Sequence, residues 1–99
     1  MRNVRNKILQ TIHRNAAAIR GYGVRRLGLF GSATRNQARA NSDLDFVVEF
    51  DRKSFDAYMD LKDFLGKIFR RPVDLVIADA IKPRLRPMIM KEVVHAAGL

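Results

Sequence analysis

Three aspartates are the residues whose type and spacing could do chemistry in this chain of 99 residues. Asp43 and Asp45 stand two positions apart, in a segment whose apolar residues alternate as they do in a β-strand. Side chains at positions i and i+2 of a strand project from the same face, roughly 6.6 Å apart along the chain. Two carboxylates in that arrangement could hold divalent cations such as Mg²⁺, which prefers oxygen ligands.

Asp74 is the third carboxylate, and it lies in another segment with strand periodicity. If that strand lies beside the first, Asp74 joins Asp43 and Asp45. Two magnesium ions about 3.5 to 4 Å apart can clamp an in-line displacement at phosphorus. The third carboxylate could then bridge to a metal or take the proton from an attacking hydroxyl. The alternative is that all three carboxylates are solvated surface charges.

A glycine–serine pair upstream supplies groups that a phosphate needs. Gly31 permits close approach of a ligand to the backbone, and Ser32 adds a hydroxyl donor beside the amides of a predicted helix start. Arg35 follows one turn later, and its guanidinium suits the geometry of phosphate oxygens. A Gly-Ser pair alone is usually only a turn, so the prediction of a nucleotide site depends on its combination with the aspartates.

The elements that must position these residues begin with a helix over about residues 3–20, which we expect to stop at Gly21 and Gly23. A strand is predicted over 24–30, and a short helix begins near Ala33 with Ser32 as its cap. Residues 36–42 read as a polar loop.

The second half of the chain repeats this alternation of elements. A strand over 44–50 places Asp43, Asp45, Val47 and Glu49 on the face opposite its larger apolar residues. An amphipathic helix over 54–68, a strand over 73–77 and a last helix over 88–97, with Pro87 near its first position, follow. The order predicts an α+β fold with a small sheet covered mainly on one face by helices, and the directions in which its strands pair stay open.

The amino-acid composition excludes several classes of protein. Without cysteine there is neither a disulfide framework nor a thiolate zinc site, which fits a cytoplasmic protein, and no apolar run approaches the roughly 20 residues of a membrane span. The length predicts one domain, residues 1–99. Lysine and arginine total 19 against 10 acids, and nine of those acids fall within residues 42–80. The excess of positive charge indicates either general affinity for polyanions or a cation-binding acidic cluster that meets a polyanionic ligand.

The chain resembles the minimal nucleotidyltransferases of the DNA polymerase beta superfamily. The resemblance covers about residues 24–95 and rests on three segments: Leu29-Phe30-Gly31-Ser32-Ala33-Thr34-Arg35, Ser42-Asp43-Leu44-Asp45-Phe46-Val47-Val48-Glu49-Phe50 and Val73-Asp74-Leu75-Val76. It implies a nucleotidyltransferase fold with a small mixed sheet, and transfer of a nucleoside monophosphate, AMP from ATP, with two Mg²⁺ ions. By position, Gly31, Ser32 and Arg35 would bind the nucleotide, and Asp43, Asp45 and Asp74 would be the catalytic and metal-binding residues.

The same resemblance implies a biological setting. Family members of this size are commonly bacterial or archaeal and often act as antitoxins of a small helical HEPN-domain ribonuclease, some by adenylylating a tyrosine of that toxin. A complex with the toxin or an oligomer of the chain itself is therefore expected, in the cytoplasm, with no membrane and no specific nucleic-acid ligand. Two alternatives stay open: a binding module that neutralises the toxin by occlusion without chemistry, and a basic nucleic-acid binder supported only by the net charge of +9.

Overall fold

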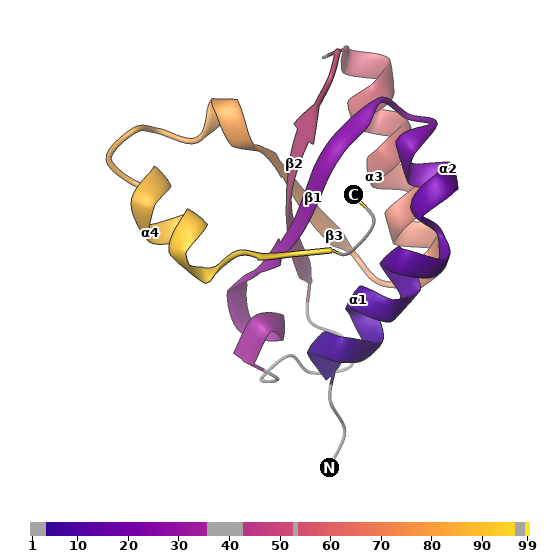
Figure 1. Ribbon diagram of the computed structural model, residues 1–99, viewed down its shortest axis with the longest axis horizontal. Helices are drawn as coiled ribbons and strands as arrows, with labels where there is room; N and C mark the ends of the chain where they lie inside the picture. The colour runs from indigo at the N-terminus through magenta and orange to yellow at the C-terminus, as the bar shows by residue number, and fades with distance from the viewer. Residues whose placement is uncertain (1–3, 36–42, 53, 97–98) are drawn as a thin grey trace.

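A four-stranded sheet with helices on both faces is the framework of the computed structural model, which describes residues 4–35, 43–52, 54–96 and 99. The sheet has the strand order β3-β2-β1-β4. The elements in chain order are α1 (Val4–Arg14), α2 (Ala16–Arg20), β1 (Val24–Phe30), the 3₁₀ helix η1 (Gly31–Arg35), β2 (Leu44–Phe50), α3 (Phe55–Phe69), β3 (Val73–Ile77), the 3₁₀ helix η2 (Ala78–Ala80), α4 (Arg86–Glu92) and β4 (Val94–His95). Helices α1, α2 and α3 cover one face, and α4 stands on the other (Figure 1). The predicted α+β class is confirmed.

The amino-terminal helix is divided in two, where the sequence predicted one continuous helix over residues 3–20. The division falls at Asn15, whose backbone has φ −105° and ψ 14° and whose side-chain amide donates to the carbonyl oxygen of Thr11 at 2.8 Å. Asparagine competes for backbone hydrogen bonds in this way, which weakens a helix interior. Gly23, at φ +85°, supplies the positive φ expected of the turn, whereas Gly21 is right-handed at φ −59°.

The three long strands have the bounds that the sequence predicts. β1 runs antiparallel to both β2 and β4, and β2 runs parallel to β3. The sheet is therefore mixed, and β2 lies between β1 and β3. The polar loop predicted at 36–42, between β1 and β2, falls outside the described residues.

The two faces of β2 bury different sets of side chains, as its alternation predicts. Leu44, Phe46 and Val48 join the large core beneath α1, α2 and α3. Val47 instead belongs to a smaller apolar cluster on the opposite face, which we call the second cluster. Its buried members are Val47, Ala78 and Ile81, and Phe30, Val76, Ile89 and Val93 pack against them.

Helix α3 follows the prediction to within one residue at each end. It begins after Ser54, whose hydroxyl accepts a hydrogen bond from the Ala57 amide at 3.0 Å, and it ends at Arg70 in the left-handed conformation at φ 54°. The Tyr58 hydroxyl donates to the carbonyl oxygen of Leu75 at 2.7 Å, which ties α3 to β3.

The carboxyl-terminal segment differs from the prediction of a helix over 88–97. Helix α4 occupies Arg86–Glu92, with a proline in its first turn as expected, and the chain then becomes the short strand β4 beside β1. Gly28 of β1 makes this crossing possible, because a Cβ atom there would overlap the side chain of Val93. No helix in the described part of the chain is both long and apolar enough to span a bilayer.

Candidate active site

The sheet brings two of the three predicted carboxylates into direct register. Asp45 is the second residue of β2, Asp74 is the second residue of β3, and the parallel pairing places them opposite each other. Both lie on the face away from α1, α2 and α3, because Leu44 and Val73, the residues before them, are buried in the core on the other face. The condition on which Asp74 was predicted to join the site, a third strand beside the second, is thus met.

The charges of the neighbouring carboxylates act on Asp45. Partial burial raises the pKa of Asp45 above its ordinary value, and the charge of Asp74, a hydrogen bond shared with Asp74, and the charge of Asp43 raise it further. Each of these causes disfavours the ionised form of Asp45. A cation placed among the three residues would reverse that effect, since it would stabilise the ionised carboxylates.

Gly31 meets the same carboxylate from the end of β1. Phe30, the last residue of β1, is the register partner of Asp45, and Gly31 follows it at φ +78°. A Cβ atom on Gly31 would overlap Oδ2 of Asp45 and lie 3.2 Å from its Cγ. Glycine is therefore required here for two reasons, the left-handed backbone and the space that the Asp45 carboxylate occupies.

The short helix after Gly31 starts earlier than expected. η1 begins at Gly31 itself, not near Ala33, so Ser32 lies in its first turn and does not precede it as a cap. The buried Thr34 hydroxyl donates to the carbonyl oxygen of Gly31 at 2.7 Å and holds this turn closed. The side chains of Ser32 and Arg35 lie outside what the structure describes, so their predicted contacts with a nucleotide remain predictions.

Whether the site suits a divalent cation can be judged from its donors. Within the described residues, no three or more His, Cys, Asp or Glu side chains are already grouped as a metal site. Asp45 and Asp74 instead share a hydrogen bond, with Asp43 near enough to repel Asp45. Mg²⁺ prefers oxygen ligands and is commonly held by one or two carboxylates, and an ion bound among these aspartates would offset their mutual repulsion. The residues present fit the ion.

The sequence did not predict that apolar side chains of the second cluster lie beside the carboxylates. Val47 and Val76 lie two residues beyond Asp45 and Asp74 on the same face of the sheet, and both belong to the second cluster together with Ile89 of α4. The available signal was the alternation of β2 and β3, which sends Val47 and Val76 to the face of the aspartates. The site is therefore bordered by η1 at one end and by the packing of α4 on the sheet at the other (Figure 1).

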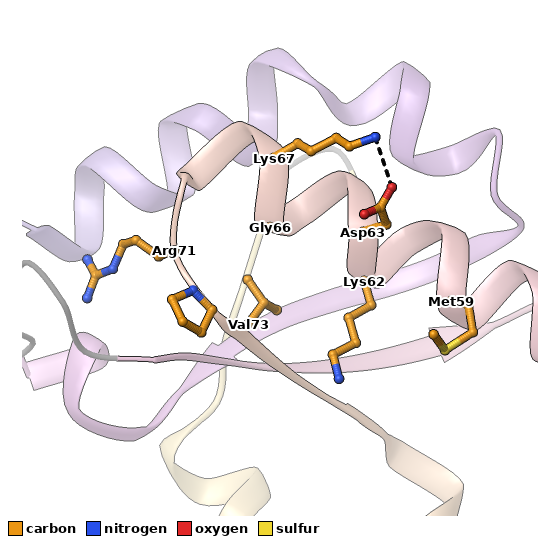
Figure 2. A pocket seen from close by; sticks show the side chains of 8 residues that line it. Met59, Lys62, Asp63, Gly66, Lys67, Arg71 and Val73 are labelled. Atoms are coloured by element: carbon orange, nitrogen blue, oxygen red, sulfur yellow. Dashed lines mark ion pairs between the residues drawn. The ribbon is translucent and has the colours of Figure 1, made fainter.

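Two hollows lie elsewhere, along the side of α3. One of about 350 Å³ is lined by residues of α3 and the start of β3, as Figure 2 shows: Met59, Lys62, Asp63, Gly66, Lys67, Arg71, Pro72 and Val73. The other, of about 320 Å³, is lined by Ser54, Phe55, Tyr58 and Ile77. Val73 and Ile77 pack on the helix-covered face, so these hollows are on the side of the sheet opposite the carboxylates. They do not form part of the candidate active site.

Comparison with known proteins agrees with this geometry. The nucleotidyltransferase domain family matches residues 9–95, so the chain belongs to that family and has its enzyme class. The protein adenylyltransferase MntA of Thermococcus cleftensis is 33% identical over 75 residues, which are 75% of this chain and 76% of the relative. A solved structure assigned as a minimal nucleotidyltransferase is 31% identical, with a TM-score of 0.72 over 87% of this chain and 93% of its own.

A more distant structure shares the fold. The MNT antitoxin complex with a tri-AMPylated HEPN toxin from Shewanella oneidensis matches with a TM-score of 0.65 at 19% identity, over 92% of this chain and 73% of the other. At that identity the match supports the nucleotidyltransferase fold. The adenylyltransferase relative and the minimal nucleotidyltransferase structure confirm the expectation of a minimal nucleotidyltransferase.

Proposed function

We propose that this protein is a magnesium-dependent protein adenylyltransferase that moves AMP from ATP to a hydroxyl of a HEPN-domain toxin and so acts as its antitoxin. The observation that carries the proposal is the register pairing of Asp45 with Asp74, with Gly31 against the same carboxylate. The relative named as a protein adenylyltransferase and the fold shared with a HEPN complex support the choice of AMP and of the toxin.

Each candidate residue has a role in this proposal. Asp43, Asp45 and Asp74 would hold Mg²⁺, which when bound neutralises charge on the triphosphate and on the departing pyrophosphate. Gly31 presents backbone without a side chain, which lets a phosphate approach the start of η1. Ser32 and Arg35 would donate to phosphate oxygens from the same short helix.

The transfer itself is a substitution at phosphorus. The oxygen of the acceptor hydroxyl bonds to the α-phosphorus of ATP, and the bond from that phosphorus to the bridging oxygen breaks. Pyrophosphate leaves with the electron pair, and Asp74, which is exposed on the open face, takes the hydroxyl proton. The chain's contribution is mainly to position these groups and to place charge where the reaction needs it.

The first test is calorimetric titration of ATP with Mg²⁺ into the wild type and into the Asp43→Ala, Asp45→Ala double variant. Asp56→Ala with Asp60→Ala is the matched control, because it removes two exposed aspartates of α3 on the other side of the sheet. We expect magnesium-dependent binding in the wild type and the control, and none in the site variant. A folded wild type that binds no nucleotide would refute the proposal.

The second test is transfer of labelled AMP to the HEPN-domain protein of the organism that encodes this chain. The adenylylated residue is then located by mass spectrometry, and we expect a tyrosine. If the toxin is neutralised equally well by the Asp43→Ala, Asp45→Ala variant, the protein acts by occlusion and the enzymatic proposal fails.

A further inference from the structure

Helix α4 presents an exposed apolar side on the same face of the sheet as the carboxylates. We call residues 82–92 the α4 arm. Four large hydrophobic side chains are exposed among the described residues, and two of them, Leu85 at 39% and Met88 at 67%, are on this arm. Leu85 is the N-cap of α4 and Met88 lies in its first turn, whereas Ile89, the next residue, packs against the second cluster.

The charge of the α4 arm is strongly positive. Lys82, Arg84, Arg86 and Lys91 oppose a single acid, Glu92, within these eleven positions. Arg86 is paired with Asp79 at 3.6 Å, and Lys82, Arg84 and Lys91 are exposed around the two apolar side chains. An apolar centre surrounded by cations complements a partner surface that carries apolar anchors surrounded by carboxylates.

Contacts in the second cluster connect the α4 arm to the candidate active site. Ile89 packs in the same cluster as Val76, and Val76 is two residues, roughly 6.6 Å, beyond Asp74 on the same face of β3. A protein that presents a hydroxyl to Asp74 must approach this open face, because α1, α2 and α3 cover the other one (Figure 1). The α4 arm stands on this same open face, beside the route of such an acceptor.

We propose that the outer side of the α4 arm is the docking surface for the acceptor protein. The occupant is an acidic surface of that protein whose apolar side chains, about one helical turn apart, contact Leu85 and Met88. This inference rests on the proposed function, since the docked protein is the one that receives AMP.

The test compares two double variants of matched composition. Leu85→Ser with Met88→Ser alters the α4 arm, and Phe55→Ser with Met59→Ser alters α3, where the other two exposed hydrophobics are 77% and 44% exposed. Phe55 and Met59 border the two hollows on the far side of the sheet. The probe is the HEPN-domain protein used for the transfer assay. Folding, oligomeric state, magnesium-dependent ATP binding, affinity for the probe and AMP transfer are measured for each variant and for the wild type.

We expect both variants to fold and to bind ATP as the wild type does. The arm variant should lose affinity for the HEPN-domain protein, and raise its apparent KM in transfer, by about tenfold or more. The α3 variant should match the wild type in its affinity for the HEPN-domain protein and in its apparent KM. A further variant, Lys82→Glu with Arg84→Glu, should weaken binding most at low salt, because the attraction is between exposed charges.

For a wild type that binds the HEPN-domain protein, three results would overturn the inference: unchanged affinity in the arm variant, an equal or larger loss in the α3 variant, or a wild-type homodimer that the arm variant converts to monomers. These results are separable from failure of the proposed function. If the probe binds but receives no AMP, the adenylyltransferase proposal fails, and the affinities still decide whether the arm is the docking surface. If the wild type does not bind the probe, the inference fails as well.

Discussion

Replacing Gly31 with alanine should damage the candidate active site more than it damages the fold. Gly31 has φ +78°, a conformation that costs an alanine about 1 to 2 kcal/mol. The added Cβ would also overlap Oδ2 of Asp45 and lie 3.2 Å from its Cγ, so the carboxylate must move away. A displacement of about 1 Å at a catalytic group can lower a rate about 100-fold.

Gly23→Ala is the matched control for this prediction. Gly23 has nearly the same backbone conformation, φ +85°, but a Cβ there would meet only the carbonyl oxygen of Arg52, at 3.9 Å. Its alanine variant should lose a similar 1 to 2 kcal/mol, by the same roughly estimated backbone cost, and retain catalysis.

Urea unfolding gives the free energy of unfolding of both variants, and transfer of labelled AMP gives their rates. We expect comparable stabilities, with Gly31→Ala the less stable where the displaced Asp45 adds strain, and a loss of about 100-fold in transfer for Gly31→Ala alone. If Gly31→Ala transfers AMP as fast as Gly23→Ala, the contact between Gly31 and Asp45 does not position the carboxylate, and the geometry argued for the site is wrong.

Three further substitutions test other parts of the structure. Asp45→Asn should raise the free energy of unfolding by about 1 kcal/mol at neutral pH without divalent cations, because folding disfavours the ionised carboxyl beside Asp74. This gain in stability should disappear in acid, where the carboxyl of Asp45 is protonated. Transfer of AMP should be abolished. Tyr58→Phe should cost about 1 kcal/mol in unfolding, through the lost hydrogen bond to Leu75, and leave ATP binding unchanged in calorimetry. Burial and, to a lesser degree, the charge of Arg26 lower the pKa of His95. The stability that neutral His95 contributes should therefore be lost as the pH falls below about 6.5. In thermal melts at a series of pH values, His95→Gln should lose less stability over that acid range than the wild type does.

The bounds of a helix or strand were predicted correctly where a single sequence pattern extends over the whole element. Alternation predicted the bounds of β2 and β3, an apolar segment ending at Gly31-Ser32 predicted those of β1, and helical spacing predicted α3 to within a residue. The break at Asn15 is a change of backbone conformation at a single residue, and the two-residue strand β4 depends on pairing with a distant strand. Neither leaves a periodic signal, so a helix was predicted across both.

The residues of the candidate site could be predicted from the sequence, but their positions relative to one another could not. Local spacing places Asp43 and Asp45 on one face, but the position of Asp74 depends on β3 pairing with β2, which no local pattern specifies. The contact between Gly31 and the Asp45 carboxylate likewise requires the antiparallel register of β1 with β2. Residue types could therefore be assigned to the site from the sequence, while their mutual distances required the sheet.

The pattern that folds β2 and β3 also creates the chemistry, because each strand alternates between two environments. In β2, the step from Leu44 to Asp45 passes from the core to the open face, and in β3 the step from Val73 to Asp74 does the same. A register slip of one residue would bury both carboxylates and expose both apolar side chains, which the core could not tolerate. Burial of the core therefore fixes the register that opposes the two aspartates, although their repulsion works against folding. Packing of the apolar face of the sheet thus fixes the positions of the two aspartates, and a bound cation would offset the repulsion between their carboxylates.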